Sequence, residues 1–148
     1  MELSELQKKI KNECITCVEA WKVDNWHEPI DIDYDDYVNH CYNYGGAEVR
    51  NLIDELLSGS SDEEQQDFYE SVSFACEYHN RGIQSAVGCR LRSLRLRTDL
   101  TQDELAKKAG ITRANLSNIE AGKYSAGIDT LNKITKALGA EIEISYGE

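Results

Sequence analysis

The sequence predicts an all-α protein with an acidic helical region over residues 1–80, a smaller helical domain over 83–139 and a short β-strand in the tail 140–148. Three observations predict this. Apolar residues recur at helical spacing along most of the chain. Two short capped helices joined by a tight turn occupy Leu100–Gly122. The charge is divided: residues 1–80 hold 5 Lys or Arg and 19 Asp or Glu, whereas residues 81–148 hold 11 and 8.

The acidic region contains four helical patterns separated by turn signals. The first has Leu3, Leu6, Ile10 and Cys14 on one face, and the segment 25–36, with the only Pro, interrupts it. Ser61 followed by Glu64 predicts a capping box before the last of these helices. We therefore expect helices over residues 3–22, 35–44, 47–57 and 61–79.

Arg81-Gly82 is the expected boundary between the regions. Beyond it, Thr101 and Glu104 form a second capping box, and Gly110 supplies the positive φ that ends a helix at low cost. Thr112 is placed to cap the next helix, in which Leu116 and Ile119 point inward. The expected helices cover residues 83–97, 102–109, 112–121 and 128–138.

The tail alternates in polarity from Ala140 to Tyr146, which is typical of a strand. A lone strand needs a partner for its backbone. The tail is therefore expected to pair with its own copy in a dimer or with the sheet edge of another protein.

Val87–Gly139 resembles the phage repressor and Cro-like helix-turn-helix domain, also called the Xre family. The resemblance covers the C-terminal third of the chain. It rests on Arg95, Leu100-Thr101-Gln102, Leu105-Ala106, Gly110-Ile111-Thr112, Asn118-Ile119-Glu120-x-Gly122-Lys123 and Thr130-Leu131-x-Lys133-Ile134-x-Lys136-Ala137-Leu138-Gly139.

The resemblance implies a domain that binds double-stranded DNA, as a homodimer, with its second helix in the major groove. The family positions that reach base edges are here Arg113, Ala114, Ser117 and Asn118. The positions that contact phosphates are Gln102, Thr112, Asn115 and Lys123. The alternatives are that only two of the first four read bases, and that Gln102 and Lys123 are merely solvated.

The same resemblance pairs Arg95 with Glu120 as a partly buried ion pair, which assigns both residues to the fold rather than to DNA. One departure from the family is that Ala126-Gly127 stand where many members have Pro and Ser. The loop over 124–127 is therefore expected to be looser.

Metal binding and catalysis are not predicted. Cys14, Cys17, Cys76 and His79 could form a zinc set, but they lie on predicted helices, mostly on apolar faces, so core cysteines are the favoured interpretation. The segment that starts at Asp31 begins like a calcium loop but lacks the Gly and Glu that such a loop needs. No nucleophile–base pairing and no phosphate-binding Gly loop is present, so no enzyme and no cofactor are expected.

The chain has no apolar run that could span a membrane and no signal-peptide pattern, so a soluble, cytoplasmic protein is expected. Five Cys without an export signal indicate free thiols. The low sequence pI of 4.7 does not argue against DNA, because residues 81–136 hold 11 basic and 5 acidic groups.

The acidic region is either a solvated helical domain or the binding site of a basic partner, and its net charge of −14 keeps it away from DNA. Its aromatic residues could form a core or anchor an interface. They are Trp21, Trp26, Tyr34, Tyr37, Tyr42 and Tyr44.

Two functions follow. The chain is a sequence-specific transcriptional regulator, a repressor by resemblance. Alternatively, it is an antitoxin whose acidic half binds a toxin while the C-terminal domain represses the shared promoter.

Overall fold

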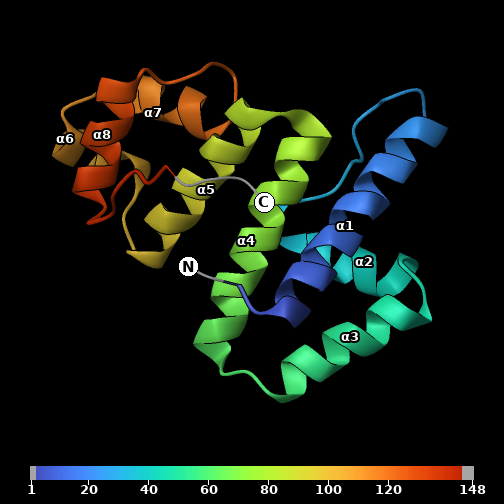
Figure 1. The fold of residues 1–148 in the computed structure, drawn as a ribbon. Helices are drawn as coiled ribbons and strands as arrows, with labels where there is room; N and C mark the ends of the chain where they lie inside the picture. The colour runs from blue at the N-terminus through green and yellow to red at the C-terminus, as the bar shows by residue number, and fades with distance from the viewer. Residues whose placement is uncertain (1–2, 145–148) are drawn as a thin grey trace. The chain divides into compact units, whose positions relative to one another are not determined.

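The computed structural model describes residues 3–144, and its regular elements in this range are all helical (Figure 1). The all-α prediction is confirmed. The helices are α1 (Glu5–Asp24), η1 (Tyr34–Asp36), α2 (Tyr37–Tyr44), α3 (Ala47–Ser58), α4 (Asp62–Arg81), α5 (Ile83–Arg97), α6 (Gln102–Ala109), α7 (Arg113–Glu120) and α8 (Ile128–Ala137). The chain divides into two compact units, Met1–Ala86 and Val87–Glu148, and the boundary between them falls within the residues of α5.

The first unit is built on α1 and α4, which pack along their length in the same direction (Figure 1). Lys11 bonds to Ser71 near their middles, and Lys22 bonds to the carbonyl of Asn80 near their ends. Helices α2 and α3 complete the layer around one apolar core. Its buried members are Ile10, Cys14, Val18, Ile30, Tyr37, Val38, Cys41, Val49, Ile53, Leu56, Phe68, Val72 and Cys76.

A buried polar network fixes the loop between α1 and η1. The side chain of Asn80, which is 1% exposed, accepts from the backbone N–H of Ile30 at 2.7 Å and donates to its carbonyl at 3.0 Å. Beside it, the Glu77 carboxylate accepts from the hydroxyl of Tyr37 and from the guanidinium of Arg81. Each buried polar group therefore has a partner, as low-dielectric surroundings require.

Helix α1 begins two residues later than expected because Ser4 caps it. The Ser4 hydroxyl accepts from the N–H of Gln7, and the Gln7 side chain accepts from the N–H of Ser4. Gln can take the second position of a capping box as Glu does. The helix also runs two residues further, to Asp24.

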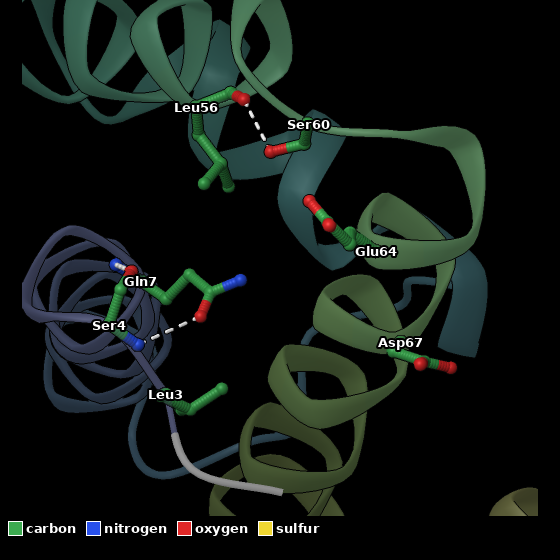
Figure 2. Close-up of a pocket in the computed structure, with 7 residues that line it drawn as sticks. All are labelled: Leu3, Ser4, Gln7, Leu56, Ser60, Glu64 and Asp67. Atoms are coloured by element: carbon green, nitrogen blue, oxygen red, sulfur yellow. Dashed lines mark hydrogen bonds between the residues drawn. The ribbon is translucent and has the colours of Figure 1, made fainter.

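The capping box expected at Ser61 is only half formed. The Ser61 hydroxyl accepts from the N–H of Glu64 at 3.2 Å, but the return bond from the carboxylate is absent. Figure 2 shows that the Glu64 carboxylate extends into a pocket instead. This pocket has a volume of about 590 Å³ and is lined by Leu3, Ser4, Gln7, Leu56, Ser60, Glu64 and Asp67.

The aromatic residues of this unit divide between core and surface. Tyr37 is buried, and Trp21 and Tyr42 pack against the core. Tyr34 is half-buried, with its hydroxyl 3.3 Å from Glu70. Trp26 and Tyr44 are exposed. The core interpretation therefore holds for Tyr37, Trp21 and Tyr42, whereas an interface role for the exposed Trp26 and Tyr44 stays a prediction.

The second unit packs the end of α5 with α6, α7 and α8 around a smaller core. Its buried members are Leu91, Leu105, Ala106, Ala109, Leu116, Ile119, Ile134 and Ala137. The observed helices match the expected ones to within one residue at each end.

The C-terminal strand expected over residues 140–146 is not formed in the part that the structure describes. Residues 140–144 have no regular secondary structure, and Ser145 and Tyr146 lie outside the described residues. A single strand finds no second strand to pair with among residues 3–144, which are helical or irregular.

Candidate nucleic-acid interface

Two short helices, α6 and α7, meet across a turn that the local sequence specifies. Thr101 and Glu104 form a complete capping box at the start of α6. Donation from the Thr101 backbone N–H lowers the pKa of Glu104, so its carboxylate stays charged near the positive helix end. Gly110 ends α6 in the left-handed conformation, with φ 74°, and Thr112 caps α7 through the N–H of Asn115.

Helix α7 buries one face and leaves the other open to solvent. Leu116 and Ile119 are at most 2% exposed and hold the helix on the core. On the other side, Arg113 and Ala114 are exposed, whereas Asn115, Ser117 and Asn118 are half-buried. The residues predicted to reach base edges thus all lie on α7, and those in its first turn are the most accessible to solvent.

The phosphate candidates keep donor groups that the fold does not use. The Thr112 hydroxyl accepts the capping bond, which leaves its own hydrogen to donate. The side-chain oxygen of Asn115, Oδ1, accepts a hydrogen bond from the hydroxyl of Tyr124, so the side-chain NH₂ group of Asn115 is left to donate. Gln102 uses one amide hydrogen on Glu120 at 3.2 Å, and Lys123, just past α7, is exposed.

Arg95 and Glu120 form a two-pronged ion pair beneath this surface. The guanidinium donates from Nε to Oε2 at 2.8 Å and from Nη2 to Oε1 at 2.9 Å. The residues are 8% and 5% exposed, and the bond to Glu120 raises the pKa of Arg95. A third bond, from Nη1 to the carbonyl of Leu100, ties the end of α5 to the start of α6.

Helix α5 lies against the end of α7 at a glycine. A Cβ placed on Gly88 would stand 2.3 Å from the carbonyl oxygen of Ile119 and 2.8 Å from that of Glu120. Only a residue without a side chain allows this approach. Gly88 and the ion pair together set the position of α7 on the unit.

Comparison with known proteins places this arrangement in a family. A model of the helix-turn-helix family matches residues 91–144. An uncharacterized HTH-type transcriptional regulator of Archaeoglobus fulgidus is 39% identical over 54 residues, which are 36% of this chain and 77% of that protein.

The chain belongs to the helix-turn-helix family.

Two further relatives resemble this chain over about half of their own length. The immunity repressor protein of Bacillus phage phi105 is 37% identical over 62 residues, which are 42% of this chain and 43% of the repressor. The protein named "Putative antitoxin HigA2" of Mycobacterium tuberculosis is 44% identical over 57 residues, which are 38% of this chain and 56% of that protein. No solved structure matches the chain.

The contact between Tyr124 and Asn115 in the helix-turn-helix was not predicted from the sequence. Its hydroxyl donates to Asn115 on α7, so the loop after α7 is tied back to the first turn of that helix. A separation of nine residues matches neither helical nor strand periodicity, so no pattern marks this pair. A second such contact is the exposed pair of Arg113 and Asp103, 3.7 Å apart.

The residues considered for zinc lie in the first unit, outside the helix-turn-helix. Cys14 and Cys76 are buried in its core, where burial raises the pKa of Cys76 to about 12 and that of the half-buried Cys17 to about 11. These thiols therefore stay protonated. Across residues 3–144, no group of three or more His, Cys, Asp or Glu is arranged to hold a metal ion. In the same range, no helix is both long and apolar enough to cross a membrane.

Proposed function

We propose that the chain is a sequence-specific DNA-binding transcriptional regulator, and specifically a repressor, that inserts α7 into the major groove of duplex DNA. The observation that carries the proposal is the solvent-facing side of α7, which presents Arg113, Ala114, Ser117 and Asn118 from a doubly capped helix pair. The family membership and the regulator names among the relatives support it.

The polar side chains on α7 suit base recognition. Arg113 can donate two bonds to a guanine, and Asn118 can exchange two bonds with an adenine, each worth about 1–3 kcal/mol of discrimination. Ala114 and Ser117 are small enough to let the helix approach the base edges. Because the pair of Arg113 with Asp103 is exposed and 3.7 Å long, it costs little to exchange for a base.

The groups around α7 suit the phosphate backbone. Gln102 and Thr112 stand at or next to helix N-termini, where backbone N–H groups and the helix dipole already favour an anion. Asn115 in the first turn of α7 and Lys123 just past its end supply further donors. We expect the protein to bind as a dimer to half-sites about one helical turn apart.

The test is a comparison of three alanine variants on a selected operator and on random DNA. Asn118→Ala and Arg113→Ala should weaken binding to the operator more than to random DNA. Lys123→Ala should weaken binding to all sequences alike and reduce the salt slope by about one. Equal losses on every sequence for Asn118→Ala would contradict its base-reading role. Lys136→Ala on α8 is the matched control for charge.

A second candidate function is that of an antitoxin, with residues 1–80 binding a toxin while α7 acts on the shared promoter. The net charge of −14 in these residues and the antitoxin name of one relative favour it. The test is whether a neighbouring reading frame encodes a protein that is toxic alone and co-purifies with this chain. A neighbour that is harmless and does not co-purify would remove this candidate.

A further inference from the structure

Trp26 lies almost wholly in solvent, although tryptophan is among the costliest side chains to expose. It is 91% exposed, and Val23, three residues earlier, is 68% exposed. By contrast, Trp21 of the same helix end packs against the core. The Trp21 side chain therefore contributes to the core of the first unit, whereas the Trp26 side chain does not.

The backbone at Trp26 is in the left-handed conformation, which residues other than glycine rarely adopt. Its φ is 58°, and that of His27 is 64°. Consecutive left-handed residues other than Gly persist only where their surroundings fix them, and such positions gather at binding sites. Here they turn the chain sharply at the end of α1 and leave the indole outside.

Hydrogen bonds fix the loop on both sides of Trp26. Before it, the Asn25 side chain donates to the carbonyl of Trp21 at 2.7 Å. After it, Ile30 is held by Asn80 through two buried bonds, and Arg81 donates to the same carbonyl at 2.8 Å. Trp26 thus lies in the loop between α1 and η1, which hydrogen bonds hold at both ends (Figure 1, the segment after α1). A fixed aromatic loses little entropy when it is buried by a partner.

The loop around Trp26 is negatively charged. Between Val23 and Asp31 the chain has three acidic residues, Asp24, Glu28 and Asp31, all exposed, and no Lys or Arg. The basic groups that contact the loop are already bonded: Lys22 donates to two carbonyls at the end of α4, and Arg81 donates to Ile30 and Glu77. The acids are therefore left to face a partner.

We propose that residues 23–31 form a docking loop for a basic protein, which takes the Trp26 indole into an apolar pocket rimmed by Lys or Arg. Charge complementarity selects this partner over a second copy of the acidic unit, which would be repelled, and over an anionic membrane. An indole at the centre with acids around it matches the anatomy of an interface hot spot, and it also favours cation–π contacts with the basic rim.

The inference is independent of the DNA-binding role. It assigns to one loop the partner binding that the second candidate function places somewhere within residues 1–80. The two can therefore fail separately, as the tests below allow.

The first experiment identifies the partner by position. The photo-cross-linker p-benzoylphenylalanine is introduced at position 26 of the full chain in its native host, and at position 44 as the control. Tyr44 belongs to the same unit and is 76% exposed. A basic protein cross-linked from position 26 and not from position 44 supports the proposal. A second copy of this chain, a lipid, or no specific adduct at position 26 overturns it.

The second experiment measures binding of that purified protein to the full chain by calorimetry. Trp26→Ala should weaken binding at least about tenfold, Trp26→Phe should weaken it less, and Tyr44→Ala should leave it within about twofold. The triple variant Asp24→Asn, Glu28→Gln, Asp31→Asn should weaken binding and flatten its salt dependence. Circular dichroism and operator binding of each variant show that both units are intact.

If the basic protein binds the Trp26→Ala variant and the parent chain with equal affinity, the proposal of a docking loop is overturned. If a toxic neighbour nevertheless co-purifies with both, the antitoxin candidate stands and the loop is not its site. If the loop binds a basic protein that is harmless in the host and no toxic neighbour co-purifies with the chain, the inference stands and the antitoxin candidate fails.

Discussion

The Glu120 carboxylate is buried, and it accepts two bonds from the Arg95 guanidinium and one from the Gln102 amide. Glu120→Gln would leave the Arg95 guanidinium buried without its countercharge. Loss of one partner of a buried pair costs about 3–5 kcal/mol. We therefore expect amide hydrogen exchange across α5–α7 to accelerate and the melting temperature of the second unit to fall.

Asp129→Asn is the matched control for Glu120→Gln. It removes one negative charge from an exposed position in the first turn of α8. It should change the stability by no more than about 0.5 kcal/mol. An unchanged melting temperature for Glu120→Gln would show that the ion pair does not hold α7 in place.

Partners close in sequence could be predicted from their spacing, whereas a distant pair such as Arg95 and Glu120 could be predicted only from the family resemblance. The caps at Thr101 and Thr112 follow from spacings of three residues, and the structure forms both. Ser61 and Glu64 have the same spacing, yet Glu64 faces a pocket made by other elements. The bonds between Asn80 and Ile30 join residues 50 positions apart, and no periodicity marks such a pair.

At the scale of elements, the contact between α5 and α7 depends on Gly88. Gly88→Ala places a methyl group within 2.3 Å of the carbonyl of Ile119, so one helix must shift. Overpacking of this kind costs about 1–3 kcal/mol. We expect Gly88→Ala to lower the thermal stability of the second unit and, because α7 moves, to weaken operator binding.

Gly127→Ala serves as the control for Gly88→Ala. Gly127 has φ −65°, and a Cβ there meets no atom within 4 Å. Gly127 is the N-cap residue of α8, so the gain from a less flexible unfolded chain is opposed by the poorer N-cap preference of alanine, and its substitution should change the stability by less than about 1 kcal/mol. Wild-type stability and operator affinity in Gly88→Ala would mean that the two helices tolerate a wider separation.

Helix positions were predictable because capping and apolar spacing are local properties. The ends of α6 follow from Thr101 and Gly110 alone. The start of α1 differs from the expected one by two residues because Ser4 and Gln7 form a capping box, in which Gln takes the position that Glu more often holds. The tail strand depended on a partner outside the chain, which the alternation of Ile142 and Ile144 cannot supply. The close approach of α5 to α7 at Gly88 could not be predicted either, because a glycine inside a helix can have several structural reasons.

At the scale of the whole molecule, the division of charge has a consequence for DNA binding. The first 80 residues carry −14, whereas residues 81–148 carry +3. Like charges repel over about one Debye length, which is roughly 10 Å at 0.1 M salt and 3 Å at 1 M. The acidic unit should therefore weaken the attraction of the full chain to any duplex at low ionic strength, whatever the sequence.

The measurement compares the full chain with a fragment of residues 83–148, which keeps α5 whole. On random DNA below about 0.1 M salt, the fragment should bind more tightly than the full chain, and the difference should shrink as salt screens the acidic unit. The ratio of operator to random affinity should be the same for both, because the base-reading groups lie on α7. Circular dichroism establishes that the fragment is folded. A folded fragment that binds random DNA no better than the full chain would mean that the acidic unit does not act on the duplex through its charge.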